Sequence, residues 1–191
     1  MMTPEVLVPI ASVLLIYLCR MVELKTKRKT ISGPVKESLT FRLFMLAGTV
    51  MLAGSITEFL VRGQKWEWVT FVAGWICAVF SFVLRRKAIT ALGKFWSLHV
   101  EIRENHEFVK SGPFRWMRHP TYFSMILELL SAGLILNAYF TLAAVTVIFV
   151  PALILRLKLE ETALVEKFGA TYRAYQHQTP AIFPYKWPRT K

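Results

Sequence analysis

The 191-residue sequence contains no aspartate and only two cysteines, Cys19 and Cys77, both within apolar runs. Thiols in such surroundings are typical of reduced packing residues, so we expect neither a disulfide nor a cysteine-ligated metal. The absence of aspartate weakens any Ser-His-Asp site, and no GxSxG turn occurs. No two glycines have GxG spacing, which argues against a dinucleotide-binding loop. The common hydrolase and nucleotide-binding classes therefore find no support.

Positive charge is abundant, and so is hydrophobicity. The chain carries 24 Lys and Arg against 12 Glu, for a net charge of +12, while 54% of its residues are hydrophobic and the mean hydropathy is +0.42. A soluble nucleic-acid-binding protein does not combine these properties, whereas a membrane protein with several spans does. We therefore expect membrane lipids, and no nucleic acid, among its partners.

Five apolar segments predict an all-α, polytopic protein in which residues 1–191 form one integral membrane domain. The uncharged run that ends at Leu155 is too long for one span of about 20 residues. Asn137-Ala138-Tyr139 offers a turn within it, so the last two helices should form a tight hairpin. The expected spans are 5–22, 42–61, 68–85, 121–136 and 139–157.

The charges also predict an orientation. With five spans, all but two of the 24 cations fall on one side of the membrane, and only Arg62 and Lys65 fall on the other. Cytoplasmic loops carry the excess of Lys and Arg. The N-terminus should therefore face outward and the C-terminus should lie in the cytoplasm, together with segments 94–122 and 156–188.

These two cytoplasmic segments hold more polar detail than orientation requires, which suggests a site at the membrane surface. His99, His106 and His119 lie in the first segment and His177 in the second. No HxxxH or CxxC pair is present, so we expect no metal. Ser111-Gly112-Pro113 predicts a turn, and Pro120 suits the first turn of a membrane helix. This arrangement could be an interfacial loop with no further role.

Three features allow both a structural and a functional interpretation. Arg156 and Glu160 share one helix face where the last span ends, as an ordinary ion pair or as a carboxylate-binding fork. Glu128 is a carboxylate about two turns into the fourth span, where a charge costs roughly 3 kcal/mol. Pro151 removes a backbone hydrogen bond within the fifth span, so a kink is expected.

Four blocks of sequence resemble the isoprenylcysteine carboxyl methyltransferase family of integral membrane enzymes. They are SGPFRWMRHPTYFS (111–124), RLKLEE (156–161), FGATYRAY (168–175) and a proline-containing tail that ends near Pro184. The RHPxY string alone is shared with membrane phospholipid methyltransferases and sterol reductases, whereas the ordered set is specific. The chain resembles the short prokaryotic form, because eukaryotic members have additional N-terminal spans.

The resemblance implies an enzyme that uses S-adenosyl-L-methionine, releases S-adenosyl-L-homocysteine and methylates the carboxylate of a lipid-linked, prenylcysteine-like substrate. Arg156 and Glu160 would be the catalytic residues and would meet the substrate carboxylate. His99 stands where eukaryotic members carry another polar residue. By motif position, the cofactor would be held by His99, His106, Glu107, Phe108, Val109, Phe114, His119, Pro120, Thr121 and Tyr122.

Two other functions are considered. A phospholipid N-methyltransferase would use a similar cofactor pocket, with Glu160 as the base that deprotonates an amine and Arg156 bound to phosphate. A non-enzymatic membrane adaptor or lipid-binding protein would use the basic loops alone, but gives no reason for His, Arg and aromatic residues to concentrate at one helix end. The sequence does not identify the acceptor, and a monomer is the default expectation.

Overall fold

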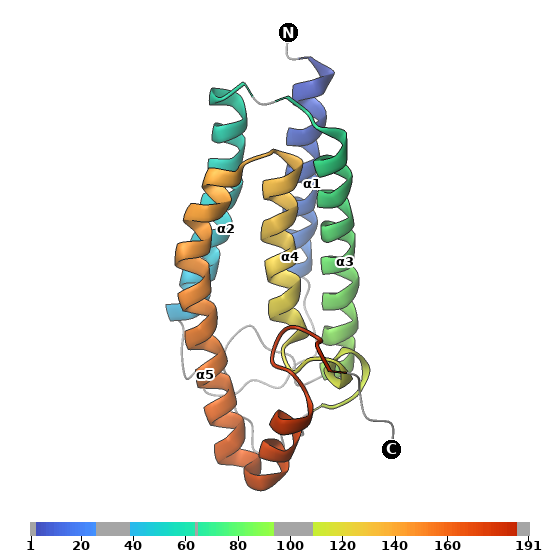
Figure 1. Cartoon of the computed structure of the whole chain (residues 1–191), viewed down its shortest axis with the longest axis vertical. Coiled ribbons are helices and arrows are strands. Elements are labelled where there is room, and N and C mark those ends of the chain that lie inside the picture. The colour runs from blue at the N-terminus through green and yellow to red at the C-terminus, as the bar shows by residue number, and fades with distance from the viewer. Residues whose placement is uncertain (1–2, 26–38, 64, 94–108, 187–191) are drawn as a thin grey trace.

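The structure, a computed structural model, describes residues 3–25, 39–63, 65–93 and 109–186. Within these ranges the chain forms helices and no strands. Among the described residues, five main helices run up and down in one bundle, with the start of α1 at the upper end in Figure 1 and the turn that leads into α4 at the lower end. Their bounds are α1 Pro4–Lys25, α2 Leu39–Val61, α3 Trp68–Leu92, α4 Pro120–Ile135 and α5 Tyr139–Gln178, with a short 3₁₀ helix, η2, at Gly112–Arg115.

Four helices, α1, α2, α3 and α5, are long and apolar enough to cross a membrane. The helix α4 is apolar but has only 16 residues. At 1.5 Å per residue it spans about 24 Å, less than the hydrocarbon core of about 30 Å. The predicted all-α membrane architecture is thus confirmed in its helices, whereas the crossing by α4 and the orientation stay predictions.

Two helices extend beyond their predicted ends. The helix α3 continues from Leu84 through three cations to Leu92, because Arg85 turns into the bundle instead of toward solvent. The helix α5 continues past residue 157 to Gln178, and its lower half projects below the other helices in Figure 1. The backbone angles at Pro151 remain helical, and the interruption of α5 lies at Gly169.

The predicted hairpin between α4 and α5 is confirmed. Asn137 adopts a left-handed conformation with φ 51°, which asparagine tolerates better than most residues. The amide of Ala138 donates to the carbonyl of Gly133 at 2.9 Å. Glu58 of α2 caps the first turn of α5 by accepting from the amides of Phe140 and Thr141, at 3.2 and 2.7 Å. The turn therefore connects two helices that are also fixed at their ends.

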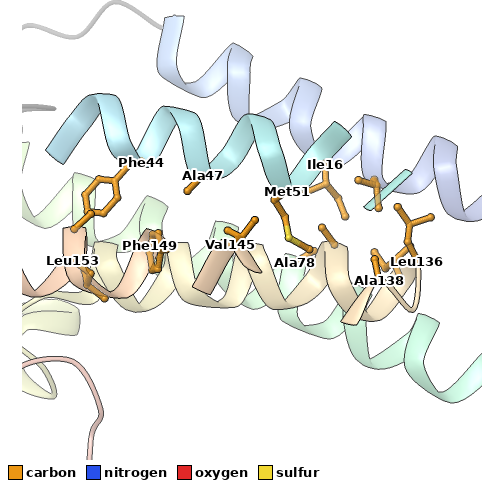
Figure 2. Packing of buried hydrophobic residues seen from close by; sticks show 14 of the residues in the cluster. Ile16, Phe44, Ala47, Met51, Ala78, Leu136, Ala138, Val145, Phe149 and Leu153 are labelled. Carbon is orange, nitrogen blue, oxygen red and sulfur yellow. The ribbon is translucent and has the colours of Figure 1, made fainter. Parts of the chain in front are cut away.

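The apolar core lies between α2 and α5 on one side and α3 and α4 on the other. Phe44, Ala47 and Met51 of α2 face Val145 and Phe149 of α5, as Figure 2 shows, and the rings of Phe44 and Phe149 are 5.3 Å apart. Alternation of small and large side chains lets the two helices approach closely. The lower end of α4 lies beside the middle of α5, where Tyr122 contacts Arg156 and Glu160.

The contact between α3 and α4 depends on Gly74. A Cβ added there would lie 2.6 Å from Cγ1 of Ile135 and 2.9 Å from the carbonyl oxygen of Ser131, so the helices would have to separate. We expect Gly74→Ala to lower the free energy of unfolding by about 1–3 kcal/mol. Gly48→Ala in α2 is a matched control, because nothing lies within 4 Å of its added Cβ. Thermal unfolding in detergent should show Gly48→Ala unchanged or stabilised by up to about 1 kcal/mol. Equal melting temperatures for the two variants would contradict this close packing.

Gly169 reverses the end of α5. Its φ of 55° and ψ of −128° are angles that a residue with a Cβ rarely adopts. The last turns of α5, after Gly169, run back toward the lower ends of α3 and α4 in Figure 1. We call residues 170–182 the returning arm. It brings Tyr175 and Gln176 against residues far earlier in the chain.

Candidate active site

The chain enters α4 through a turn that the returning arm holds in place. Gly112 has φ 60°, and η2 follows it with Phe114 buried. The hydroxyl of Tyr175 donates to the carbonyl of Phe114 at 2.6 Å. Pro120 then occupies the first turn of α4, as predicted, and His119 precedes it with φ −126° and ψ 63°. A rigid loop thus presents His119 and Tyr122 at the lower end of the bundle.

Arg156 occupies the centre of a polar cluster between α2, α4 and α5. Its side chain is buried, with 3% of the residue exposed. Nε donates to the Tyr122 hydroxyl and to Oε1 of Glu160, both at 3.1 Å, and Nη1 donates to Oγ1 of Thr40 at 3.2 Å. The Tyr122 hydroxyl also donates to Glu160. Two hydroxyls from neighbouring helices and one carboxylate of α5 itself therefore fix the orientation of the guanidinium group.

His119 lies between two consecutive glutamates of α5. Its Nδ1 is 3.4 Å from Oε2 of Glu160, and its Nε2 is 3.1 Å from Oε1 of Glu161. Both ring nitrogens can donate only when the imidazole is protonated. The ring also stacks on Tyr122, with centroids 5.5 Å apart and planes 15° apart. We infer an imidazolium that binds both carboxylates.

Arg118 connects Glu161 to the returning arm. Nε and Nη2 of Arg118 lie 2.7 and 2.6 Å from Oε1 of Glu161, while the Gln176 amide donates to Oε2 at 3.0 Å. The backbone amides of Arg118 and His119 donate to the carbonyls of Pro180 and Ala181, each at 2.9 Å. The returning arm therefore closes one side of the cluster.

The charges around His119 change its protonation. Burial alone would lower the pKa of His119, but hydrogen bonds to Glu160 and Glu161 and their negative charges raise it above its ordinary value. Because the folded-state pKa exceeds the unfolded value of about 6.5, this stabilisation is complete below about pH 6.5 and is lost as pH rises through the folded-state pKa.

His119→Gln tests this protonation. The melting temperature of wild type should exceed that of the variant by more at about pH 6 than at about pH 9, because the imidazolium is lost at the higher pH. Differential scanning fluorimetry can measure the melting temperatures of both proteins, in a detergent whose charge does not change between these pH values. His177→Gln, in the exposed part of the returning arm, is the matched control and should match wild type at both pH values. A gap that widens with rising pH would contradict a protonated His119.

The described residues include most of the predicted site. His119, Tyr122, Arg156 and Glu160 are in direct contact, and Phe114 joins them through the returning arm. Pro120 is buried, and Val109 and Thr121 are half-buried. Four predicted cofactor residues lie outside the described residues: His99, His106, Glu107 and Phe108. Their roles, like the catalytic roles of Arg156 and Glu160, stay predictions.

Sequence reasoning missed Glu161, Arg118, Gln176 and Thr40 as members of the cluster. Glu161 lies outside the predicted site residues, yet it binds Arg118, His119 and Gln176. One signal was available. Consecutive glutamates on a helix point about 100° apart, so one cation placed between them can meet both.

Comparisons with known proteins find a similar family and similar sequences. A model of the isoprenylcysteine carboxyl methyltransferase (ICMT) family matches residues 74–166, which include α4 and the Arg156–Glu161 segment. Protein-S-isoprenylcysteine O-methyltransferase B of Arabidopsis thaliana is 25% identical over 162 residues, covering 81% of this chain and 82% of that protein.

Two further relatives match over shorter stretches. The uncharacterized protein YpbQ of Bacillus subtilis is 33% identical over 107 residues, 56% of this chain and 62% of that protein. Protein-S-isoprenylcysteine O-methyltransferase of Xenopus laevis is 28% identical over 116 residues, 60% of this chain and 40% of that protein. In its apolar helices and in these matches, the chain is similar to the isoprenylcysteine carboxyl methyltransferase family of membrane enzymes.

Proposed function

We propose that this protein transfers a methyl group from S-adenosyl-L-methionine to the carboxylate of a lipid-linked, prenylcysteine-like acceptor, at the cytoplasmic face of the membrane. The observation that carries the proposal is Arg156, a buried guanidinium at the end of an apolar run, oriented by Tyr122, Glu160 and Thr40. A fork of oriented donors suits a carboxylate. The names of the plant and frog relatives support the same reaction.

The balance of charge in the cluster supports an anionic acceptor. Arg118, His119 and Arg156 supply three cationic groups when His119 is protonated, whereas Glu160 and Glu161 supply two carboxylates. These five side chains therefore carry a net charge of +1. A substrate carboxylate would neutralise it, and burial of a charge is tolerated when the charge is paired.

The described residues fit a cationic methyl donor. The stacked rings of His119 and Tyr122 lie beside the carboxylates of Glu160 and Glu161, and aromatic faces and carboxylates both stabilise a cation. Phe114 adds an apolar wall of the kind that adenine requires. When bound, S-adenosyl-L-methionine supplies an electrophilic methyl group on a sulfonium. His119, Tyr122 and Phe114 would hold it.

The residues of this chain have mainly a positioning role in such a reaction. A carboxylate is already ionised at neutral pH, so no base is needed to activate it. Arg156 would orient the acceptor oxygen, and Glu160 and Tyr122 would hold Arg156. The returning arm would exclude water through the hydrogen bonds of Arg118 to Glu161 and Gln176. Orientation and exclusion of water can supply most of the required acceleration.

Amine methylation is less well supported. It would need Glu160 to take a proton from the amine. Oε1 of Glu160 accepts from Arg156 and Tyr122, and Oε2 faces His119. Donors to a carboxylate favour its charged form and weaken it as a base. The contacts of Glu160 therefore favour an orienting role over a proton-accepting one.

The reaction type can be tested with purified protein, methyl-labelled S-adenosyl-L-methionine, host lipid extract and a prenylcysteine mimic. Product treated with base should release the label as volatile methanol, which identifies a methyl ester. Label that remains in lipid after base would identify N-methylation and overturn the proposal. Heat-denatured protein provides the background, and S-adenosyl-L-homocysteine should inhibit incorporation.

Gel filtration with light scattering tests the expected monomer.

A further inference from the structure

A cavity lies between α1, α2 and α4, and Phe149 of α5 also lines it. Its volume is about 540 Å³, within the range of ligand-binding pockets. Leu14, Leu18 and Met21 of α1 line it and are 48%, 61% and 48% exposed, so the cavity opens on the outer face of the bundle. Met45, Gly48 and Leu52 of α2 form the opposite wall. A single hydrocarbon chain from the bilayer has the chemistry to occupy such a space.

One end of this cavity is polar. Arg20 and Glu128 line it and belong to a closed ring of four alternating charges with Glu23 and Arg85. Nη1 of Arg20 lies 2.8 Å from Oε2 of Glu23, which lies 3.1 Å from Nη1 of Arg85. Arg85 in turn binds Glu128. Glu128, for which the sequence allows a structural and a functional interpretation, is thus paired within the bundle.

The ring is weakest on the side that faces the cavity. Nε of Arg20 is 3.7 Å from Oε2 of Glu128, beyond hydrogen-bonding distance, whereas the Arg20–Glu23 and Arg85–Glu23 contacts are 2.8 and 3.1 Å. A group that both accepts from Arg20 and donates to Glu128 would complete it. The ring has two positive and two negative side chains. An anionic or cationic head would therefore add an uncompensated charge in an apolar environment, at a cost of several kcal/mol.

We propose that this cavity binds an uncharged, single-chain amphiphile with a hydroxyl head, such as a long-chain alcohol. The hydroxyl would bridge Arg20 and Glu128, and the chain would lie between α1 and α2. This site goes beyond the proposed function. Phe44 lies between the two sites, since it lines the cavity and its ring stands 6.2 Å from that of Tyr122. The cavity has its own polar end at Arg20 and Glu128, so the ligand proposed here differs from the methyl acceptor in its head group.

Photolabelling of the full chain in phosphatidylcholine nanodiscs tests the site. The probes are hexadecanol, hexadecanoic acid and hexadecane, each with a diazirine at the same carbon, and the labelled residues are mapped by mass spectrometry. Hexadecanol should label α1 and α2 around the cavity saturably, about tenfold more than the other two probes. Because no methyl transfer is measured, a protein without methyltransferase activity can still show saturable labelling at this cavity.

Two variants test the contacts of the probe's alkyl chain and of its hydroxyl head separately. Gly48→Leu should fill the cavity, because open space surrounds its Cβ, and should reduce hexadecanol labelling about tenfold. Leu60→Phe, on an exposed position of the same helix outside the cavity, should label as wild type. Arg20→Met removes one side of the weak contact while Arg85 still binds both glutamates. It should reduce hexadecanol labelling to the level of hexadecane.

Several results would overturn the proposal. Equal labelling by the acid would show that the ring does not select an uncharged head. Unchanged labelling of a folded Gly48→Leu variant would place the probe elsewhere. Labelling in detergent that disappears in phosphatidylcholine nanodiscs would identify a bulk phospholipid chain as the occupant.

Discussion

Arg156→Ala should reduce methyl transfer by at least about a hundredfold, the range found when an oriented electrostatic donor is removed from an active site. The reason is geometric: the guanidinium is buried and is held by Tyr122, Glu160 and Thr40. Without it, nothing else in the described cluster offers a fork of donors at the end of the apolar part of α5. Release of base-labile methanol measures the rate.

Cofactor affinity distinguishes a lost substrate anchor from a misfolded site. Binding of S-adenosyl-L-homocysteine to Arg156→Ala, measured by calorimetry, should stay within severalfold of wild type, because His119 and Phe114 are unchanged. Lys158→Ala is a matched control, since it removes an exposed cation two residues away on α5 and should keep its full rate. A normal rate in Arg156→Ala would remove Arg156 from the acceptor site.

Local sequence patterns predicted the contacts that depend on local geometry. The four-residue spacing of Arg156 and Glu160 placed them on one helix face, and the structure pairs them at 3.1 Å. Pro120 marked the start of α4, and Asn137 marked the turn into α5. In each case the signal lies within a few residues, where backbone geometry alone decides the result.

Contacts formed by the returning arm could not be read in the same way. Glu161 meets Gln176 because Gly169 reverses the chain within α5. A glycine in an otherwise helical segment is a weak signal, since it is also tolerated inside helices. The partners of Glu161 therefore depend on tertiary structure. From spacing alone, Lys158 on the same helix is an equally reasonable partner for this carboxylate.

The charge ring was missed for a related reason. Arg20 and Arg85 stand near the ends of apolar segments, where arginine usually extends to the membrane surface. Their side chains instead turn into the bundle toward Glu23 and Glu128. Only the packing of α3 along α4, which aligns Arg85 with Ser124 and Glu128, makes that direction favourable.

Arg85→Met should destabilise the protein by about 3–5 kcal/mol, the cost of leaving buried charges without their partner. Arg85 is 2% exposed and binds Glu23, Glu128, Ser81 and Ser124. Its loss would leave two carboxylates with only Arg20 between them, in the middle of an apolar bundle. Unfolding in increasing dodecyl sulfate, followed by circular dichroism, measures the change.

The neighbouring arginine shows whether this effect depends on burial or on charge. Arg86→Met removes the same charge from an exposed position one residue later in α3 and should stay within about 0.5 kcal/mol of wild type. Adding Glu128→Gln to Arg85→Met should recover part of the stability, since a neutral amide costs less to bury than an unpaired carboxylate. If Arg85→Met unfolds with wild type, the ring contributes nothing to the fold, and α1, α3 and α4 are held together by apolar packing alone.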